Sequence, residues 1–235
     1  MTEGPRYAIY FVPGPDTELH RFGAAVLGYD CYSGTELAYP HDLGLDRAEW
    51  EALTQEPRRY GFHATLKAPF YLSPSCTEAQ LAAAVENFVA LGRVVPVIAP
   101  EVRLLAGFVA IVPREPSPAV DALAADCVTI FDAYRAPMSP QERARRAASR
   151  LSAAQLANLD RWGYPYLFGE FRFHMTLTGR LDAKRRDAVL EHMRAAFARR
   201  CGDDPIAIDR IALMRQDRAD ARFRVIGHVA LRASP

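Results

Sequence analysis

The chain has 235 residues, of which half are hydrophobic and about a quarter charged, and its formal net charge is +1. This composition is ordinary for a globular protein and excludes a largely disordered chain. The near-neutral balance also excludes a strong overall electrostatic field, so attraction to nucleic acid or to a membrane surface through bulk charge has no support.

Targeting and redox features favour the cytoplasm. The sequence opens without the basic segment and apolar run of a secretory signal, and no apolar stretch approaches the roughly 18 residues that span a bilayer. The four cysteines are far apart and lack Cys-x-x-Cys spacing, which indicates neither a structural zinc site nor a redox pair. We therefore expect a cytoplasmic protein with reduced cysteines.

The beginning of the chain predicts a strand followed by a helix. Aromatic and branched residues fill positions 7–12 apart from Ala8, and Pro13 stops the strand. Asp16 or Thr17 is a suitable N-cap for the helix, which we expect to end at Gly28.

The rest of the chain predicts further helices and strands. Ser75-x-x-Glu78 forms a capping-box pattern that opens a helix ending near Gly92. The other expected elements are a helical turn or two over 46–54, strands over 95–104 and 108–112, a helix over 119–134, one or two helices within 138–162, a helix over 183–200, and a hairpin of strands over 206–214 and 223–231.

One short pattern, aromatic-x-Phe-His-x-Thr-Leu, occurs twice, over 60–66 and 171–177. Its residue types favour strands, in which every second side chain points to the same face. We therefore expect His63, Thr65 and Lys67 to share one face of the first strand.

The second copy predicts the same arrangement. Arg172, His174 and Thr176 alternate with apolar residues, so they should share a polar face while the apolar residues point into the core. Because the two copies match in the same frame, with the same Phe before and Leu after, we interpret the pair as functional rather than as two isolated structural histidines.

A larger repeat surrounds the two motifs. Residues 108–113 echo residues 8–13 at an offset of 100, whereas His63 and His174 are 111 positions apart. The difference places an insertion in the second half, over about 138–162.

The two halves therefore predict two related lobes, 1–105 and 106–235. Each lobe should contain a strand, a helix, a histidine strand, a helix and further strands. We expect an α+β architecture of antiparallel sheets with helices on the outer faces and a central cleft between the lobes.

Two histidines that face one another across such a cleft can perform acid–base chemistry. Imidazole has a reference pKa of about 6.5, so one ring can accept a proton while the other donates one. Thr65 and Thr176 can donate hydrogen bonds to the oxygens of a phosphate between the rings, and Arg172 and Lys67 can supply positive charge. We expect this site to need no metal and no cofactor.

The twin His-x-Thr pattern resembles the signature of the 2H phosphoesterase superfamily. The resemblance implies a bilobal fold built from a duplicated unit and metal-independent cleavage of 2′,3′-cyclic phosphates and related phosphodiesters. Further stretches resemble a branch of that superfamily associated with phosphonate metabolism, and they lie at residues 7–13, 19–23, 134–137 and 162–166.

That resemblance implies a function on a small ribosyl metabolite. We expect hydrolysis of its cyclic phosphate or phosphodiester, with His63 and His174 as the catalytic residues. Arg135, next to Pro137 at the end of the helix before the insertion, is a predicted phosphate ligand, although an arginine near a helix C-terminus can equally be a surface residue.

Three alternatives remain open on the sequence. The histidines could bind a metal together with Glu170, although threonine is a poor ligand and no carboxylate accompanies His63. The substrate could be an RNA end, with tyrosines for stacking and the basic stretch 143–146, but the neutral charge favours a small sugar phosphate or nucleotide. The chain could also bind a phosphorylated metabolite without catalysis, or assist assembly of a phosphonate-degrading complex.

Overall fold

The computed structural model describes residues 4–148 and 150–232. The expectation about a secretory signal rests partly on residues 1–3, and the predicted insertion contains residue 149. These positions lie outside the described residues. No helix in the described ranges is both long and apolar enough to cross a membrane.

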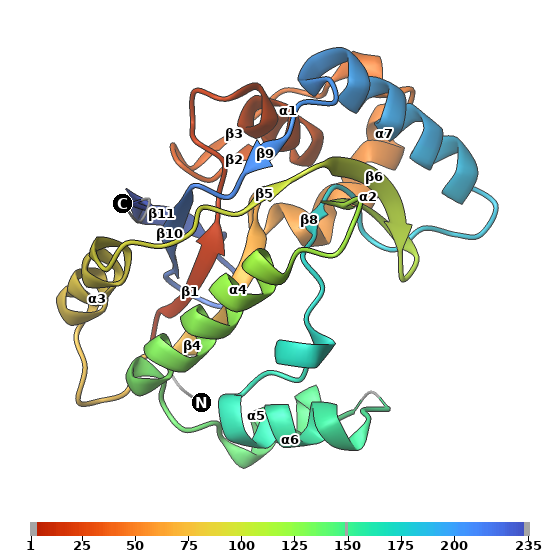
Figure 1. Cartoon of the computed structure of the whole chain (residues 1–235). Helices are drawn as coiled ribbons and strands as arrows, with labels where there is room; N and C mark the ends of the chain where they lie inside the picture. The colour runs from red at the N-terminus through yellow and green to blue at the C-terminus, as the bar shows by residue number, and fades with distance from the viewer. Residues whose placement is uncertain (1–3, 149, 233–235) are drawn as a thin grey trace.

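Seven strands form one antiparallel sheet in the order β11-β10-β1-β4-β8-β7-β6 (Figure 1). Their bounds are β1 Arg6–Phe11, β4 Ala64–Tyr71, β6 Pro100–Leu105, β7 Phe108–Pro113, β8 Met175–Thr176, β10 Arg210–Gln216 and β11 Arg224–Ala230. Two short strand pairs flank it, β2 Tyr29–Asp30 with β3 Thr35–Glu36, and β5 Val97–Ile98 with β9 Ile206–Ala207. The predicted α+β class is confirmed.

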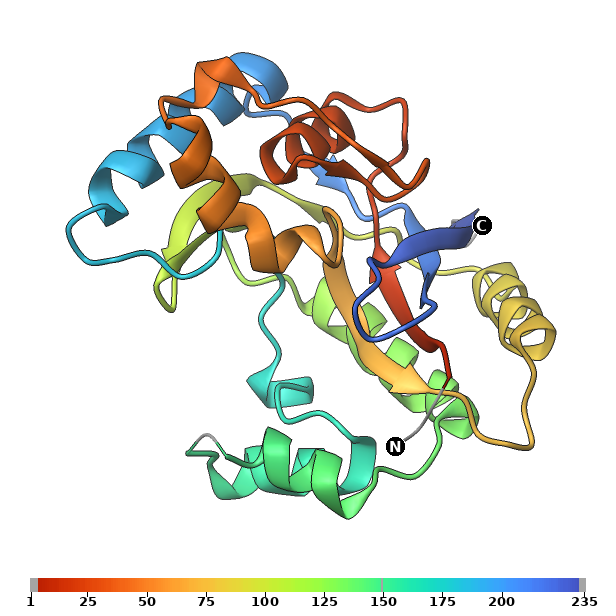
Figure 2. The same cartoon turned by 180° about the vertical axis from the view of Figure 1, so that it is seen from behind.

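The helices observed in the described residues are α1 Glu18–Leu27, α2 Arg47–Arg58, α3 Glu78–Ala90, α4 Pro118–Phe131, α5 Pro140–Arg146, α6 Ala153–Trp162 and α7 Arg186–Cys201, with 3-10 turns η1 His41–Leu43, η2 Asp132–Tyr134 and η3 Phe168–Glu170. Helices α1, α2 and α7 gather at one end of the sheet, and α4 lies along β4 (Figures 1 and 2). The pattern of helices follows the sequence expectation, with differences at several ends. The strands expected over 95–104 and 206–214 are each divided, into β5 and β6 and into β9 and β10, and the second motif strand is only the two residues of β8.

The two faces of the sheet are buried differently. Ile9 and Phe11 of β1 belong to the main core, together with the buried side chains of α1, α2, α3, α4 and α7. Tyr10, on the opposite face of the same strand, belongs to a smaller cluster with Tyr29 and Phe223. The strand alternation therefore separates a helix-covered face from a second face on which polar groups can approach the strands.

Local sequence signals predicted the two ends of α1 correctly but misplaced the start of α3. Thr17 caps α1 through its side chain, and Gly28 ends the helix in the left-handed conformation, as predicted. The predicted capping box of α3 is wrong by two residues, because Thr77 and Gln80 form it instead. The hydroxyl of Ser75 contacts that of Ser73, outside the helix.

The predicted insertion folds as α5 and α6, which lie beside each other and apart from the main core (Figure 1). Helix α5 has no buried residue, and α6 buries only Leu159 among its described residues. Arg143 pairs with Asp160 across the two helices, and Arg146 donates to the carbonyl of Pro69 near the end of β4.

The predicted boundary near residue 105 falls in the turn between β6 and β7, and the sheet continues across it. The last strands of the chain, β10 and β11, extend the sheet beyond β1, at the opposite side from β6. The division into lobes remains a prediction, but the strands of both halves are hydrogen-bonded into one sheet.

Candidate active site

The two His-x-Thr motifs meet at the centre of the sheet, where β4 pairs with β8. Ala64 lies opposite Met175 in this antiparallel pair. Residue numbers run in opposite directions along two antiparallel strands, so the same register places His63 opposite Thr176 and Thr65 opposite His174. Cross-strand neighbours of this kind have side chains about 5 Å apart on one face. The structure thus brings both histidines and both threonines together.

Burial along both motifs follows the predicted alternation. The four polar side chains are half-buried, whereas the apolar residues between them are buried. The buried set consists of Phe62, Ala64, Leu66, Phe173, Met175 and Leu177, all of which belong to the main core. The polar face of the two motifs is therefore the face opposite the helix-covered core.

Both histidines are held in the same way. Nδ1 of His63 lies 2.8 Å from the carbonyl oxygen of Gly61, and Nδ1 of His174 lies 2.7 Å from that of Arg172. A carbonyl oxygen only accepts hydrogen bonds, so Nδ1 carries the hydrogen in both rings and Nε2 is left to exchange a proton. The geometry assigns the same tautomer to both histidines.

The surroundings of the two rings differ. Tyr10 stacks on His63 with the ring centroids 3.8 Å apart and 17° between the planes, and Oγ1 of Thr65 lies 3.3 Å from Nε2 of His63. His174 has a tilted neighbour, Phe108, at 5.7 Å.

Burial lowers the pKa of His63 to about 4, and the electrostatic effect of His174 acts in the same direction. Burial also lowers the pKa of His174. Among the described residues, no carboxylate contributes to the pKa of either ring. Both imidazoles are therefore neutral at pH 7 in the free protein, and His63 has the stronger preference for the neutral form.

The register of the outer strands repeats the offsets seen in the sequence. Tyr10 of β1 lies opposite Thr65, and Ala110 of β7 lies opposite Thr176. Tyr10 and Ala110 are 100 positions apart, and Thr65 and Thr176 are 111 positions apart, as in the two sequence repeats. The strand order β1-β4-β8-β7 is accordingly symmetric about the contact between the two motif strands.

Lys67 does not lie with His63 and Thr65, so the predicted shared face is wrong. Thr65 pairs with Tyr10, but a register irregularity in β4 makes Lys67 pair with Ile9 on the opposite face. There Nζ is buried and donates to the carbonyl of Val128 and to Asp132, both at 3.1 Å.

The two predicted arginine ligands already have partners within the protein. Arg135 forms a two-bond ion pair with Asp132, on the same side as Lys67, and also donates to the carbonyl of Arg161. Arg172 is exposed and donates to the carbonyls of Gly169 and Phe171. Arg172 lies two positions before His174 in sequence, whereas Arg135 belongs to the cluster on the far face. Their predicted roles as substrate ligands remain predictions.

Glu170 is not placed by strand alternation with His174, because it lies in the 3-10 turn η3. Its carboxylate accepts a hydrogen bond from Gln155 of the insertion. The metal alternative, which needs Glu170 beside His174, has no support from this placement.

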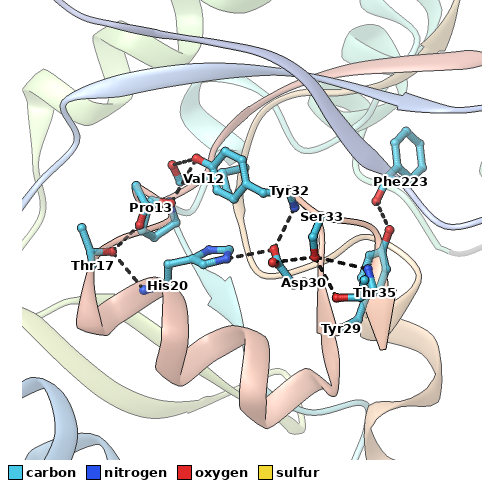
Figure 3. A network of polar contacts seen from close by, with 11 residues as sticks. Val12, Pro13, Thr17, His20, Tyr29, Asp30, Tyr32, Ser33, Thr35 and Phe223 are labelled. Carbon is cyan, nitrogen blue, oxygen red and sulfur yellow. Dashed lines mark hydrogen bonds and ion pairs between the residues drawn. The ribbon is translucent and has the colours of Figure 1, made fainter. Parts of the chain in front are cut away.

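His20 belongs to a separate polar network (Figure 3). It is buried, and Nε2 lies 3.1 Å from Asp30, which also accepts hydrogen bonds from the backbone of Tyr32 and from Ser33. This arrangement joins α1 to the segment that follows it, which gives His20 a structural role. His192 is exposed on α7.

Tyr10 is the neighbour of the motifs that sequence reasoning missed. The sequence placed it in the first strand, and alternation there puts it on the face opposite Ile9 and Phe11. Only the pairing of β1 with β4 reveals that this face is the one that carries His63.

Residues 65–224 match the family described as "Protein of unknown function (DUF1045)", and the chain belongs to this family. Two curated relatives are named "Ribose 1,5-bisphosphate phosphokinase PhnN". The protein of Janthinobacterium sp. (strain Marseille) is 38% identical over 93% of this chain and 49% of its own length. The protein of Laribacter hongkongensis (strain HLHK9) is 32% identical over 94% and 50%.

The chain thus spans about half the length of these curated relatives. A crystal structure described as that of a phosphoesterase aligns with 98% of this chain and 99% of its own, at 14% identity and a TM-score of 0.39. A likeness of that degree is too remote to support a conclusion about fold or function.

Proposed function

We propose that the chain is a metal-independent phosphodiesterase of the two-histidine type, which opens a cyclic phosphate on a small ribosyl metabolite. The observation that carries this proposal is the pairing of β4 with β8, which sets each histidine against the threonine of the other motif. Two imidazoles and two hydroxyls on one face are the groups that acid–base cleavage of a phosphodiester requires.

The fixed tautomers support the same chemistry. With Nδ1 of both rings donating to the backbone, one Nε2 can accept a proton from water while the other donates one to the departing oxygen. Thr65 and Thr176 donate hydrogen bonds to the phosphate oxygens, on which negative charge increases in the transition state. The matching registers of β1 with β4 and of β7 with β8 support an origin by duplication.

The named activity of the relatives is not the one we assign to this chain. A P-loop kinase binds phosphates through a Gly-rich loop that ends in Gly-Lys, and the sequence contains no Gly-Lys pair. We propose instead that the chain acts on a compound related to the ribose 1,5-bisphosphate in the name of the relatives.

Ribose 1,2-cyclic phosphate that carries a 5-phosphate fits this relation. When the bond from phosphorus to the 2-oxygen breaks, the phosphate remains on the 1-oxygen and the product is ribose 1,5-bisphosphate. The chain would then supply the compound that the named phosphokinase uses, in a pathway of phosphonate metabolism.

The test is turnover by purified protein in the presence of a chelator. The substrates are ribose 1,2-cyclic phosphate with and without a 5-phosphate, 2′,3′-cyclic nucleotides and a short RNA ending in a 2′,3′-cyclic phosphate, and phosphorus NMR identifies the product. We expect turnover of the ribosyl compound to survive EDTA and to fall by roughly 10²–10⁴ in His63→Ala and His174→Ala. His41→Ala, an exposed histidine of η1, is the matched control.

If the protein prefers the RNA end, the proposed ribosyl substrate is wrong and the function is RNA-end processing. If the protein binds the cyclic phosphate but does not turn it over, the chain is a binding protein and not an enzyme. Loss of activity on chelation that zinc restores would contradict the metal-independent mechanism.

A further inference from the structure

We propose that Tyr10 makes the two motif histidines unequal, so that His63 is the proton acceptor for the attacking water and His174 is the proton donor to the departing sugar oxygen. This inference rests on the proposed phosphodiesterase function and assigns the two roles within it.

The inequality arises at equivalent positions of the two motifs. Tyr10 lies opposite Thr65, and Ala110 lies opposite Thr176, so each is the outer-strand neighbour of one His-x-Thr motif. An aromatic ring at the first position can cover an imidazole, whereas an alanine methyl at the second cannot. The two motifs therefore share the same backbone pairing, but the side chains around their histidines differ.

His63 is fixed on three sides. The ring of Tyr10 covers one face at 3.8 Å, the carbonyl of Gly61 holds Nδ1, and the hydroxyl of Thr65 lies 3.3 Å from Nε2. A histidine enclosed in this way suits a small partner such as water, and its burial favours the neutral form that accepts a proton.

The groups around His63 do not oppose this state. The titratable and charged groups near it are the phenols of Tyr10 and Tyr60, the imidazole of His174 and, acting through Tyr10, the phenol of Tyr164 and the guanidinium of Arg6. Burial raises the pKa of Tyr10 well above its ordinary value, so this ring stays neutral. A positive charge on His174 also disfavours protonation of His63.

His174 is the more open of the two. Phe108 is tilted at 5.7 Å from it, and among the described residues no ring stacks on it. The departing oxygen belongs to a sugar, which needs more room than a water molecule. A bound phosphate anion beside His174 also favours its protonated form.

The reaction then follows with fixed roles. The water oxygen forms a bond to phosphorus while the bond from phosphorus to one ribose oxygen breaks. One water proton goes to Nε2 of His63, and Nε2–H of His174 gives its proton to the departing ribose oxygen. Each turnover consumes one water. Proton exchange with solvent restores neutral His63, and His174 takes up its proton again when the next phosphate binds beside it.

The decisive experiment compares two leaving groups in the same variants. A ribosyl cyclic phosphate releases an alkoxide that must be protonated, whereas bis(p-nitrophenyl) phosphate releases a stable phenolate that needs no proton donor. We expect His174→Ala to lose roughly 10²–10⁴ on the cyclic phosphate but less than about tenfold on the nitrophenyl diester. His63→Ala should lose activity on both, and His41→Ala on neither.

Each other outcome is decisive as well. If His63→Ala, rather than His174→Ala, keeps its activity on the nitrophenyl diester, the two roles are reversed and the proposal is overturned. Equal losses in both variants on both diesters would overturn it too. If the unaltered protein turns over neither compound, the phosphodiesterase function itself fails and this inference fails with it.

The role of Tyr10 has its own readout in the pH dependence. Tyr10→Leu removes the ring that encloses His63, so the acidic limb of kcat/KM should move upward by about one pH unit or more. Tyr10→Phe keeps the ring and should keep that limb near its original pH. Identical acidic limbs in folded Tyr10→Leu and in the unaltered protein would show that Tyr10 does not position His63.

Discussion

At the scale of single residues, the tautomer of each histidine decides what the site can do. A backbone carbonyl two positions earlier in the chain holds Nδ1 in both motifs, so the two rings present Nε2 to the same face of the sheet. This arrangement needs no carboxylate partner, unlike a catalytic triad. The consequence is that burial controls both pKa values without an opposing anion from the protein.

The plot of kcat/KM against pH should therefore be bell-shaped, with its maximum below neutral pH. The acceptor works above its pKa, which is about 4 for His63, and the donor works below its pKa, which burial lowers from 6.5 in His174. Activity of the free enzyme should rise through about pH 4 and fall before pH 6.5. In kcat the alkaline limb should lie at higher pH, because the bound phosphate anion favours the imidazolium.

Initial rates from pH 3.5 to 8.5, with the folded state checked by circular dichroism at each pH, measure both limbs. A kcat/KM that stays constant from pH 6.5 to 8.5 would contradict a histidine donor with a lowered pKa.

The threonines should act on the transition state more than on stability. Thr65→Val and Thr176→Val keep the side-chain shape and remove the hydroxyl donor, so each should lower kcat by roughly 10²–10³. The matched control is Thr129→Val on the exposed side of α4, which should leave kcat unchanged. Stopped-flow or steady-state kinetics with thermal denaturation as a folding check measure the difference. Equal kcat values in all three variants would remove the threonines from the site.

The motif residues could be predicted from the sequence because alternation and repetition are local patterns. His63, Thr65, His174 and Thr176 carry this information in their own spacing. Tyr10 could not be found in that way, because its contact with His63 depends on which strand pairs with which.

At the scale of elements, the irregularity in β4 separates the site from the electrostatic cluster behind it. Residues up to Thr65 keep the regular alternation, whereas Lys67 is turned to the face covered by α4. Because β4 bulges between Thr65 and Lys67, its first residues carry the polar face of the site, and the residue after the bulge places a buried cation on the opposite face. No sequence pattern in 60–67 marks the bulge, so strict alternation predicted Lys67 on the wrong face.

The cluster behind the sheet predicts an asymmetric response to mutation. Asp132 binds both Lys67 and Arg135, and the side chains of all three are at most 16% exposed. Asp132→Asn leaves the buried Lys67 and the half-buried Arg135 without a counter-charge and should lower the free energy of unfolding by about 3–5 kcal/mol. Lys67→Met leaves Asp132 paired with Arg135 and should cost less than about 2 kcal/mol.

Urea denaturation at pH 7 measures both values. In addition, kcat of Lys67→Met should stay close to that of the unaltered protein, because the ammonium lies on the face opposite the histidines. A loss of kcat comparable to that of the threonine variants would contradict this placement of Lys67.

At the scale of the whole molecule, the repeat is visible in the sequence but the way its parts are joined is not. The sequence divides the chain near residue 105, yet β6 from before this point pairs with β7 from after it. In the same way β10 pairs with β1 from the beginning of the chain. Long-range pairing of this kind leaves no local signal, since any of the amphipathic strands could satisfy the pattern of either half.

This arrangement predicts that neither half folds alone. A chain cut between Ala106 and Gly107 gives a fragment 1–106, in which β1 lacks β10 and β4 lacks β8, and a fragment 107–235, in which β10 and β8 lack those partners. Each fragment should show no cooperative thermal transition and poorly dispersed amide NMR signals. The two fragments expressed together should recover the dispersed spectrum of the intact chain, because the missing strand partners are then present.

Recovery of phosphodiesterase activity on mixing would also require that β4 and β8 find the same register, which sets His63 against Thr176. If fragment 1–106 alone gives a dispersed spectrum and a cooperative transition, the first half is an independent domain and the pairing across the middle of the sheet is dispensable for folding. Because six of the seven strands pair with a strand from the other side of the cut, we expect the opposite.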